Sequence, residues 1–478
     1  MRNRRASRVR AGASPVRSAA RSAWVNDPQS STLPTILVCA LFLTMILPPN
    51  LDYGALLTNA NSEQNIPTRI TLIVVIVGSC FLIARRPALW LSELRALNPF
   101  YLMFLALALV SLAWSINQGG TLHNLFKLGV VFLCFTAFTL YGWRASRFQS
   151  VMRGLVGAVL VGSVIFAVAF PHYGVQQFED YAPAETGRLA DIGSLTLRPV
   201  LRGLTYGKNQ MGQLAGLGLI FWVHGWLGKE VKTRWVVVCA GAALICLYWA
   251  HSSTSILAAA FSVPVLLMLR HWPQWLRRYM RFILVLFTML ILGYSLVVLR
   301  LIPQLDFLLT PITALTGKDL TFSNRTAIWK IVIDQIVQHP LLGTGYSAYW
   351  VDEPGSPSRV FQTLMAFWPG ESHNGYLDVL NDLGVVGCFC LLGYLFTYLR
   401  QSIKILEYDR HQGSLYVALL FHQFWSCLSE SHWFSAGSVS FTVITLAVCC
   451  LGRTLLQHRF EVSSARPPAY ALARNGVT

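Results

Sequence analysis

The stretch Leu320–Trp350 reads LTFSNRTAIWKIVIDQIVQHPLLGTGYSAYW, and residues 371–387 read ESHNGYLDVLNDLGVVG. These polar segments interrupt a chain that consists mainly of apolar runs. A helix of about 20 apolar residues is long enough to cross the hydrocarbon core of a bilayer. The contrast predicts a membrane helix bundle whose chemistry is concentrated in one large polar loop.

The composition supports a membrane protein. Hydrophobic residues make up 54% of the chain and charged residues 12%, and the mean hydropathy is +0.50. Soluble domains carry about 25% charged residues. The ten cysteines all fall inside apolar runs, so their positions predict neither a disulfide framework nor a CxxC zinc site.

We expect an all-α fold, a polytopic bundle of about 12 transmembrane helices. The apolar runs lie near residues 32–48, 68–84, 99–116, 125–141, 154–170, 210–227, 235–250, 255–269, 281–299, 383–399, 414–429 and 434–452. Helices 1–9 would occupy 32–299, with a polar loop at 171–208, and helices 10–12 would occupy 383–452. A larger loop with short helices is expected at 300–382. The Arg-rich segment 1–31 predicts a disordered cytoplasmic tail. Residues 453–478 are expected to form a C-terminal cytoplasmic tail.

The net charge of +17 is a signal of topology. Most of the 38 Lys and Arg residues lie in the N-terminal tail and in alternate loops, such as Arg85–Arg86. Most of the 21 Asp and Glu residues lie in the remaining loops. Because cytoplasmic loops are enriched in Lys and Arg, both termini are expected in the cytoplasm and both long loops outside it. The distribution argues against a nucleic-acid partner and makes the lipid bilayer the expected environment.

The first long loop ends in a candidate anion site. Arg202, Lys208 and Asn209 come just before a predicted helix, and helix N-termini attract anions. Arg202 and Lys208 could instead anchor a helix end in the headgroup region. The residues alone leave both interpretations open.

The second long loop predicts a helix from a cap at Ser323 or Asn324 to about Val337. Its apolar stripe could lie on the membrane surface or against the bundle. Arg325 in its first turn opposes the helix dipole, which suggests a nearby anion, although a solvated Arg is the alternative. Tyr346 follows two glycines and is followed by further aromatic residues, which could stack on sugars or lie at the membrane interface.

A further helix is predicted to start at a Ser372 cap, with His373 and Asn374 in its first turn and Gly384 near its end. A neutral imidazole can accept a proton at neutral pH; alternatively, His373 only hydrogen-bonds within the loop. Glu430 and His432, at the outer end of another predicted helix, could orient such a His or bind sugar hydroxyls. The sequence contains no HExxH motif, P-loop or GxGxxG motif, so we expect neither a metal nor a nucleotide cofactor.

Together these segments resemble the O-antigen ligase and polymerase superfamily, which includes exopolysaccharide polymerases of bacterial inner membranes. The resemblance covers roughly the second half of the chain. It is carried by RGLTYGKNQMG (Arg202–Gly212), SSTS (Ser252–Ser255), NRTAIWKIVIDQIVQHPLLGTGYSAYW (Asn324–Trp350), SHNGYLDVLNDLGVVG (Ser372–Gly387) and SES (Ser429–Ser431). Many relatives have His before the Lys-Asn pair, whereas Gly207 stands here, so no catalytic role is assigned to that position.

The resemblance implies a metal-independent glycosyltransferase whose active site faces the periplasm and whose donor sugars are carried on undecaprenyl diphosphate. A diphosphate leaving group needs cations where charge develops. Arg202 and Arg325 are the expected cations, with Lys208 behind them and Arg325 assigned to catalysis. His373 is the expected base, with Glu430 a weaker catalytic candidate. The expected substrate-binding residues are Arg202, Lys208, Asn209, Asn374 and Tyr346.

The leading hypothesis is a polymerase that joins lipid-linked oligosaccharide units into a surface polysaccharide or exopolysaccharide. A ligase that transfers a finished glycan to lipid A core or protein would use the same donor. A flippase or transporter is disfavoured because the predicted helix centres carry few charges. A polymerase would act beside other assembly proteins, such as a flippase and a chain-length regulator.

Overall fold

A computed structural model describes residues 31–54, 66–183, 192–271, 325–353, 356–365 and 368–465, together with single positions between 278 and 289. Outside this part of the chain lie residues 1–30 of the predicted tail at 1–31, most of the predicted run at 281–299, the candidate caps Ser323 and Asn324, and residues 466–478. Every predicted apolar run within it overlaps a helix.

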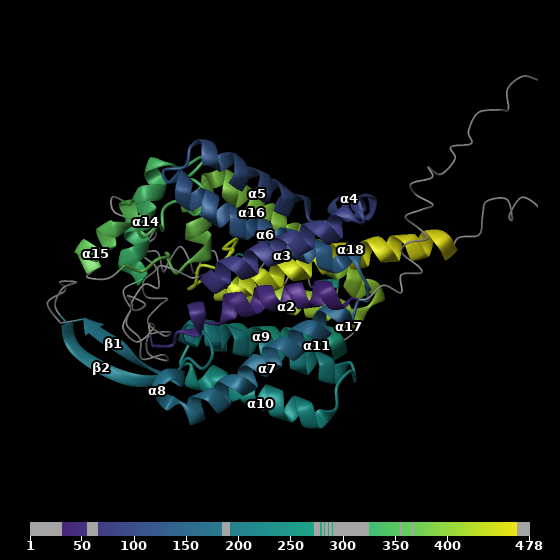
Figure 1. Cartoon of the computed structure of the whole chain (residues 1–478), viewed down its shortest axis with the longest axis horizontal. Coiled ribbons are helices and arrows are strands. Elements are labelled where there is room, and N and C mark those ends of the chain that lie inside the picture. Colours follow the sequence, from purple (N-terminus) through teal and green to yellow (C-terminus); the bar gives the residue numbers. More distant parts are fainter. Residues whose placement is uncertain are drawn as a thin grey trace, which may run out of the picture.

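The described residues form helices and connecting loops with a single hairpin, which confirms the predicted all-α membrane fold (Figure 1). The helices are α2 (Thr32–Ile46), η1 (Pro49–Leu51), α3 (Ile66–Ala84), α4 (Pro87–Leu94), α5 (Pro99–Val110), η2 (Ser111–Ala113), α6 (Gln118–Leu140), α7 (Arg147–Ala169), α8 (Pro171–Gly174), α9 (Lys208–Leu227), α10 (Thr233–Trp249), α11 (Ser253–His271), α14 (Arg325–Gln338), η4 (Pro357–Arg359), α15 (Val360–Met365), α16 (Gly375–Tyr408), α17 (Arg410–Ser426) and α18 (Val439–Ala465). The hairpin consists of β1 (Val175–Pro183) and β2 (Ile192–Leu201), which pair antiparallel. Both strands lie in the segment 171–208, which was predicted as a polar loop.

Six described helices are long and apolar enough to cross a membrane, or seven if the pair α4 and α5–η2, bent by 102°, forms one span. The predicted count of about 12 is therefore not confirmed. One reason is length: α2 has 15 residues and α10 has 17, fewer than the ~20 that a perpendicular crossing needs. The chain is nevertheless a multi-pass membrane protein.

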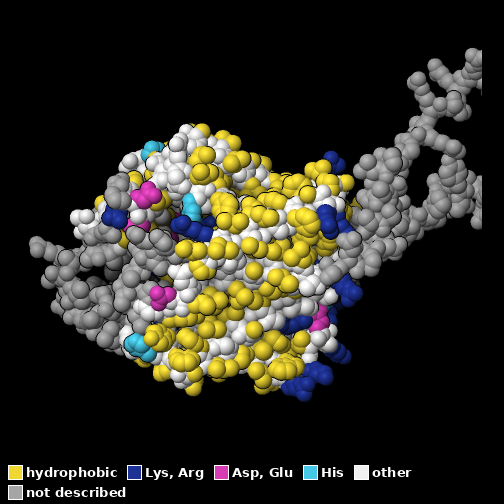
Figure 2. All heavy atoms as spheres, viewed as in Figure 1, with side chains coloured by type: hydrophobic (Ala, Val, Ile, Leu, Met, Phe, Trp, Pro, Cys, Tyr) yellow, Lys and Arg dark blue, Asp and Glu magenta, His cyan; other side chains and the backbone are white. Residues whose placement is uncertain are grey.

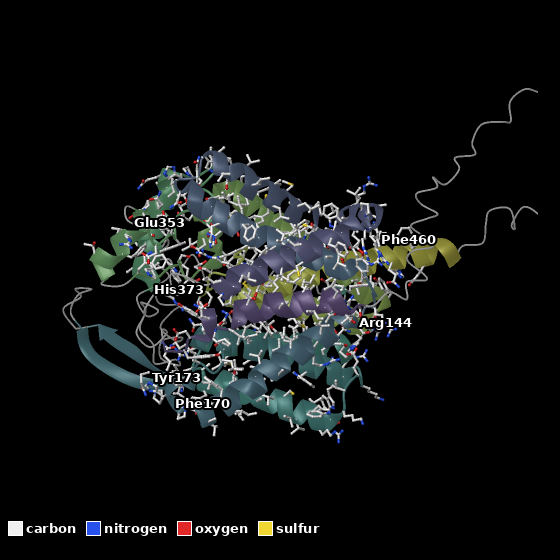
Figure 3. All side chains as sticks on the ribbon, viewed as in Figure 1. Arg144, Phe170, Tyr173, Glu353, His373 and Phe460 are labelled. Atoms are coloured by element: carbon white, nitrogen blue, oxygen red, sulfur yellow. The ribbon has the colours of Figure 1, made fainter. Side chains whose placement is uncertain are left out.

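The helices pack around α18, which is 89% buried over its apolar window, whereas α3 is only 28% buried. Hydrophobic side chains cover the band between the two ends of the bundle (Figure 2). The hairpin, α14 and α15 lie at one end, and α4 lies at the other (Figure 1). Arg144 and Phe460 are at the end opposite His373 and Glu353 (Figure 3).

The helix α14 packs against the bundle, which decides between the two locations predicted for it. Ile328, Val332 and Ile336 are buried in a small core with Tyr349 and Leu377. This core attaches α14 to the start of α16. The apolar stripe predicted from the sequence therefore fixes Arg325, at the first position of α14, relative to the residues that precede α16.

A break in α16 also positions the site. Gly384 has φ +60° and ψ −158°, a backbone conformation that side chains rarely adopt. A Cβ there would overlap the backbone of Leu341. The backbone N–H groups of Thr344 and Gly345 donate to Asn381 O and Asp382 O, each at 2.9 Å. The predicted helix end at Gly384 is therefore a kink, against which the loop leading to Tyr346 docks.

Candidate active site

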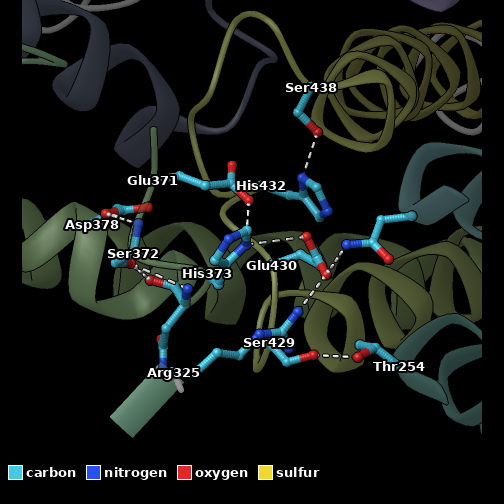
Figure 4. Close-up of polar contacts among 12 residues, drawn as sticks. Thr254, Arg325, Glu371, Ser372, His373, Asp378, Ser429, Glu430, His432 and Ser438 are labelled. Carbon is cyan, nitrogen blue, oxygen red and sulfur yellow. Dashed lines mark hydrogen bonds and ion pairs between the residues drawn. The ribbon is translucent and has the colours of Figure 1, made fainter. Parts of the chain in front are cut away.

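Glu430 joins three segments that are distant in the sequence (Figure 4). It lies in the loop between α17 and α18, and 5% of its side chain is exposed. Its Oε1 accepts a hydrogen bond from Arg325 Nη2 at 2.9 Å and from Asn209 Nδ2 at 2.8 Å. Arg325 begins α14 and Asn209 lies in the first turn of α9. The buried carboxylate thus brings together the two polar loops of the sequence.

His373 lies on the other side of Glu430, between two carboxylates (Figure 4). Its Nδ1 is 2.8 Å from Glu371 Oε1 and 3.6 Å from Glu430 Oε2. The side chains of His373 and Glu371 are 24% and 32% exposed. His373 is therefore held between a buried carboxylate and a more accessible one.

Local backbone geometry points the His373 side chain into this position. The N-cap of α16 is Asn374, whose Oδ1 accepts from the N–H groups of Tyr376 and Leu377. The prediction that Ser372 is the cap was wrong, and His373 and Asn374 precede the helix. Ser372 Oγ instead accepts from Asn374 N at 3.1 Å, and His373 has φ +53°. A short polar turn thus fixes His373 just before the helix.

The charges of the cluster determine its protonation. Burial disfavours the imidazolium of His373, but the carboxylates of Glu371 and Glu430 outweigh burial and raise its pKa to about 9. Burial of Glu430 would raise its pKa, but His373 and Arg325 lower it to about 2. At neutral pH His373 is protonated and Glu430 is ionised. The neutral imidazole expected from the sequence is not the resting form in this arrangement.

Arg202 and Lys208 are placed differently from Asn209. Arg202 is 1% exposed, and its Nε and Nη2 donate to Tyr173 O at 3.2 and 2.6 Å. These bonds hold the base of the hairpin, and no described hydrogen bond or ion pair links Arg202 to Glu430 or His373. Lys208 is the first residue of α9, next to Asn209.

Tyr346 belongs to the bundle core. It is 3% exposed, and its hydroxyl donates to Phe434 O at 2.7 Å. Its backbone N–H donates to Ser111 Oγ at 3.0 Å. Its ring packs edge-on against Phe104, with centroids 5.8 Å apart.

Two residues of the cluster's surroundings were missed or understated by sequence reasoning. Glu371 was not singled out, although an acidic residue two positions before a candidate catalytic His is a usable signal. His432 was named only together with Glu430, as a residue that could orient a His or bind sugar hydroxyls. Its Nδ1 bonds to Ser438 Oγ at 2.8 Å, and its Nε2 contacts Gln213 Nε2. These bonds fix the loop that carries Glu430.

The same residues could hold a cation. The ligand atoms of Glu371, His373 and Glu430 all lie within 4.8 Å of one another, and carboxylates with an imidazole are a usual donor set for a divalent metal. His373 would first have to lose its proton. Arg325 already supplies a positive charge to Glu430, so a metal would compete with an ion pair that is in place.

The fold and the site define a multi-pass membrane protein with a cluster of Arg, His and paired carboxylates at one end of its helix bundle. Residues 235–392 match the family model described as O-Antigen ligase. The matched segment includes Arg325, Glu371 and His373 and ends before Glu430. The chain is also 26% identical over 332 residues to the exopolysaccharide production protein ExoQ of Rhizobium meliloti (strain 1021), covering 66% of this chain and 69% of that protein. Both matches confirm the resemblance to the O-antigen ligase and polymerase superfamily.

Proposed function

We propose that the protein is a glycosyltransferase of polysaccharide assembly, which joins oligosaccharide units carried on a lipid diphosphate into a surface polysaccharide or exopolysaccharide. The observation that carries the proposal is the pair of cationic side chains held by Glu430. Arg325 Nη2 lies 2.9 Å from Glu430, and His373 lies 3.6 Å from it on the other side.

The two cations suit a diphosphate leaving group. Negative charge develops on the departing diphosphate, and positioned cations stabilise it best in a site that excludes water. Arg325 and His373 keep 19% and 24% of their side chains exposed, whereas Glu430 keeps 5%. A ligand can therefore reach the cations more readily than the carboxylate that holds them. The guanidinium has further N–H groups for phosphate oxygens.

The remaining predicted binding residues take supporting roles in this proposal. Asn209 holds Glu430 through its hydrogen bond to Oε1, and Asn374 fixes the turn at His373 as the N-cap of α16. Lys208, next to Asn209, is a further cation for the diphosphate. Arg202 supports the hairpin base, because its N–H groups bond to Tyr173 O. Tyr346 is buried in the bundle core and lines a cavity next to the cluster.

We infer that the site faces the periplasm of a bacterial inner membrane, with both termini in the cytoplasm. Arg144 is at the end opposite His373 (Figure 3), and Arg-rich loops favour the cytoplasmic side. Undecaprenyl diphosphate is the proposed carrier, and the reaction needs no metal ion. The name of the relative, an exopolysaccharide production protein, favours polymerisation over ligation.

Deleting the protein and sizing the lipid-linked and surface glycans tests the proposal. We expect single oligosaccharide units to accumulate on lipid while long surface polymer is lost. Full-length chains left on lipid would instead identify a ligase. Unchanged surface polysaccharide and unchanged lipid-linked glycans would overturn both functions.

A further inference from the structure

A cavity of about 200 Å³ lies next to the cationic cluster. It is bounded by α6, the loop around Trp350, the first turns of α16 and the loop 431–437. Lys127, Trp350, Glu371, Asp378, Asp382 and Trp433 are among its lining residues. Pockets for drug-sized ligands usually measure about 300–1,000 Å³. This smaller volume suits a ligand of about one sugar ring.

The lining has the chemistry that binds a neutral sugar. Carboxylates accept hydrogen bonds from sugar hydroxyls, and indole rings pack against the C–H faces of a sugar ring. Asp378 Oδ1 accepts from Trp350 Nε1 at 2.9 Å, which fixes both side chains at the cavity. Asp382 Oδ2 accepts from Ser347 N at 2.8 Å, and its Oδ1 has no hydrogen-bond partner in the described part of the chain. An unsatisfied buried carboxylate oxygen is costly, and a hydroxyl entering the cavity can supply the donor.

The cavity and the cationic cluster differ in charge. Glu371, Asp378 and Asp382 contribute three carboxyl groups to the lining, against the single ammonium of Lys127. The lining thus offers mainly hydrogen-bonding carboxyl groups, whereas Arg325 and His373 offer positive charge to a diphosphate. This difference favours the lipid-diphosphate donor at the cationic cluster and the acceptor sugar in the adjoining cavity. Glu371 belongs to both, because it lines the cavity and lies 2.8 Å from His373 Nδ1.

We propose that this cavity binds the acceptor sugar and that Glu371 is the base that deprotonates its attacking hydroxyl. This inference rests on the proposed function. The hydroxyl oxygen forms a bond to the anomeric carbon of the donor sugar as its proton passes to Glu371. The bond from that carbon to the diphosphate oxygen breaks, and the diphosphate leaves with the electron pair. Glu371, 32% exposed, returns the proton to solvent after the product departs.

The other two acid–base groups of the cluster suit this task less well. His373 carries a proton already at neutral pH, because the neighbouring carboxylates raise its pKa to about 9. Glu430 is 5% exposed, its Oε1 already accepts from Arg325 and Asn209, and it is not among the residues that line the cavity. Glu371 alone combines access to the cavity with contact to the cluster.

Acceptor binding can be measured without the donor. The probe is a set of oligosaccharides from partial acid hydrolysis of the producing cell's surface polysaccharide, titrated against the full-length protein in nanodiscs and followed by saturation-transfer NMR. We expect Asp382→Asn to weaken binding about tenfold, because an amide that keeps the bond from Ser347 N turns its NH2 group, which cannot accept from a hydroxyl, toward the cavity. The control Asp352→Asn removes a carboxylate that pairs with Arg359 outside the cavity and should bind normally.

The base is tested separately. Glu371→Gln should still bind the oligosaccharides measurably, because the amide oxygen can accept a hydrogen bond, but should lose about 100-fold or more in transfer, the range expected for a general base. If Asp382→Asn does not fold, Trp350→Phe replaces it as the cavity variant in the binding experiment. This variant keeps an aromatic ring but loses the hydrogen bond to Asp378.

Three results would each overturn the inference. They are no oligosaccharide binding by the wild type, wild-type affinity in both Asp382→Asn and Trp350→Phe, and full transfer activity in Glu371→Gln. The deletion experiment measures glycan products and tests the proposed function, whereas the titration measures oligosaccharide binding and tests the cavity. The two proposals can therefore fail separately.

Discussion

Two clusters of similar side chains lie at the two ends of α9. The N-terminal cluster contains Arg325, Glu371, His373 and Glu430, which Asn209 in the first turn of α9 contacts. The C-terminal cluster contains Arg153, His224, Glu230 and His411. In it, Arg153 Nη1 lies 2.8 Å from Glu230 Oε2, and His411 Nε2 lies 3.1 Å from Glu230 Oε1. Each cluster thus has a carboxylate shared by an Arg and a His.

The clusters differ in what surrounds the shared carboxylate. Glu230 and Glu430 both have a pKa near 2, because the adjacent Arg and His outweigh the effect of burial. The rings of His224 and His411 stack at 3.7 Å and are nearly parallel, so their nitrogen lone pairs cannot converge on one ion. The N-terminal cluster has a second carboxylate, Glu371, and borders a cavity. Identical residue types therefore make a packing feature at one end and a candidate site at the other.

The largest expected effect separates the two clusters by activity. Arg325→Ala and His373→Ala should each reduce polymer formation about 100-fold or more while the protein reaches the membrane at normal levels. Arg325→Lys should also be poor, because Lys lacks the planar fork that binds phosphate. Lys330→Ala, on the exposed side of the same helix, is the matched control. Polymer of normal length from both alanine variants would remove the distinction between the clusters.

A smaller effect is expected at the C-terminal cluster, on stability. Glu230→Gln leaves Arg153, whose side chain is 7% exposed, without its ionic partner. The loss should be about 1–3 kcal/mol of unfolding free energy, measured as a lower Tm in detergent. Activity per mole of folded protein should match the wild type. A loss of activity as large as that of Arg325→Ala would show that this cluster also serves catalysis.

The smallest expected effect is a change of Tm with pH, which tests the ion pairs of His373 with Glu371 and Glu430. Because folding raises the His373 pKa from 6.5 to about 9, its protonated form contributes stability that is fully present below pH 6.5. This contribution is lost as the pH rises through 9. The Tm of the wild type should decline over this interval, and the decline should shrink in His373→Gln. Parallel Tm curves for the two proteins would contradict the ion pairs assigned to His373.

Local sequence features predicted much of this molecule. The apolar stripe of α14 correctly indicated the buried face at Ile328, Val332 and Ile336. Gly384 was expected near a helix end but lies at a kink. Both features need the positive φ that glycine adopts readily. The cap was assigned to Ser372 because Ser and Asn are about equally good N-caps. The hairpin of β1 and β2 was missed, and with it the role of Arg202 at the base of that hairpin.

The sequence by itself determined that this is a multi-pass helical membrane protein and which polar loops carry its motifs. Bilayer partitioning depends on the composition of each segment, which can be read locally. Only the tertiary structure decided that Glu430 meets Arg325, 105 positions away, and Asn209, 221 positions away. It also decided the protonation of His373 and the existence of the acidic cavity. These properties arise from distances between charges and from burial, which no single segment contains.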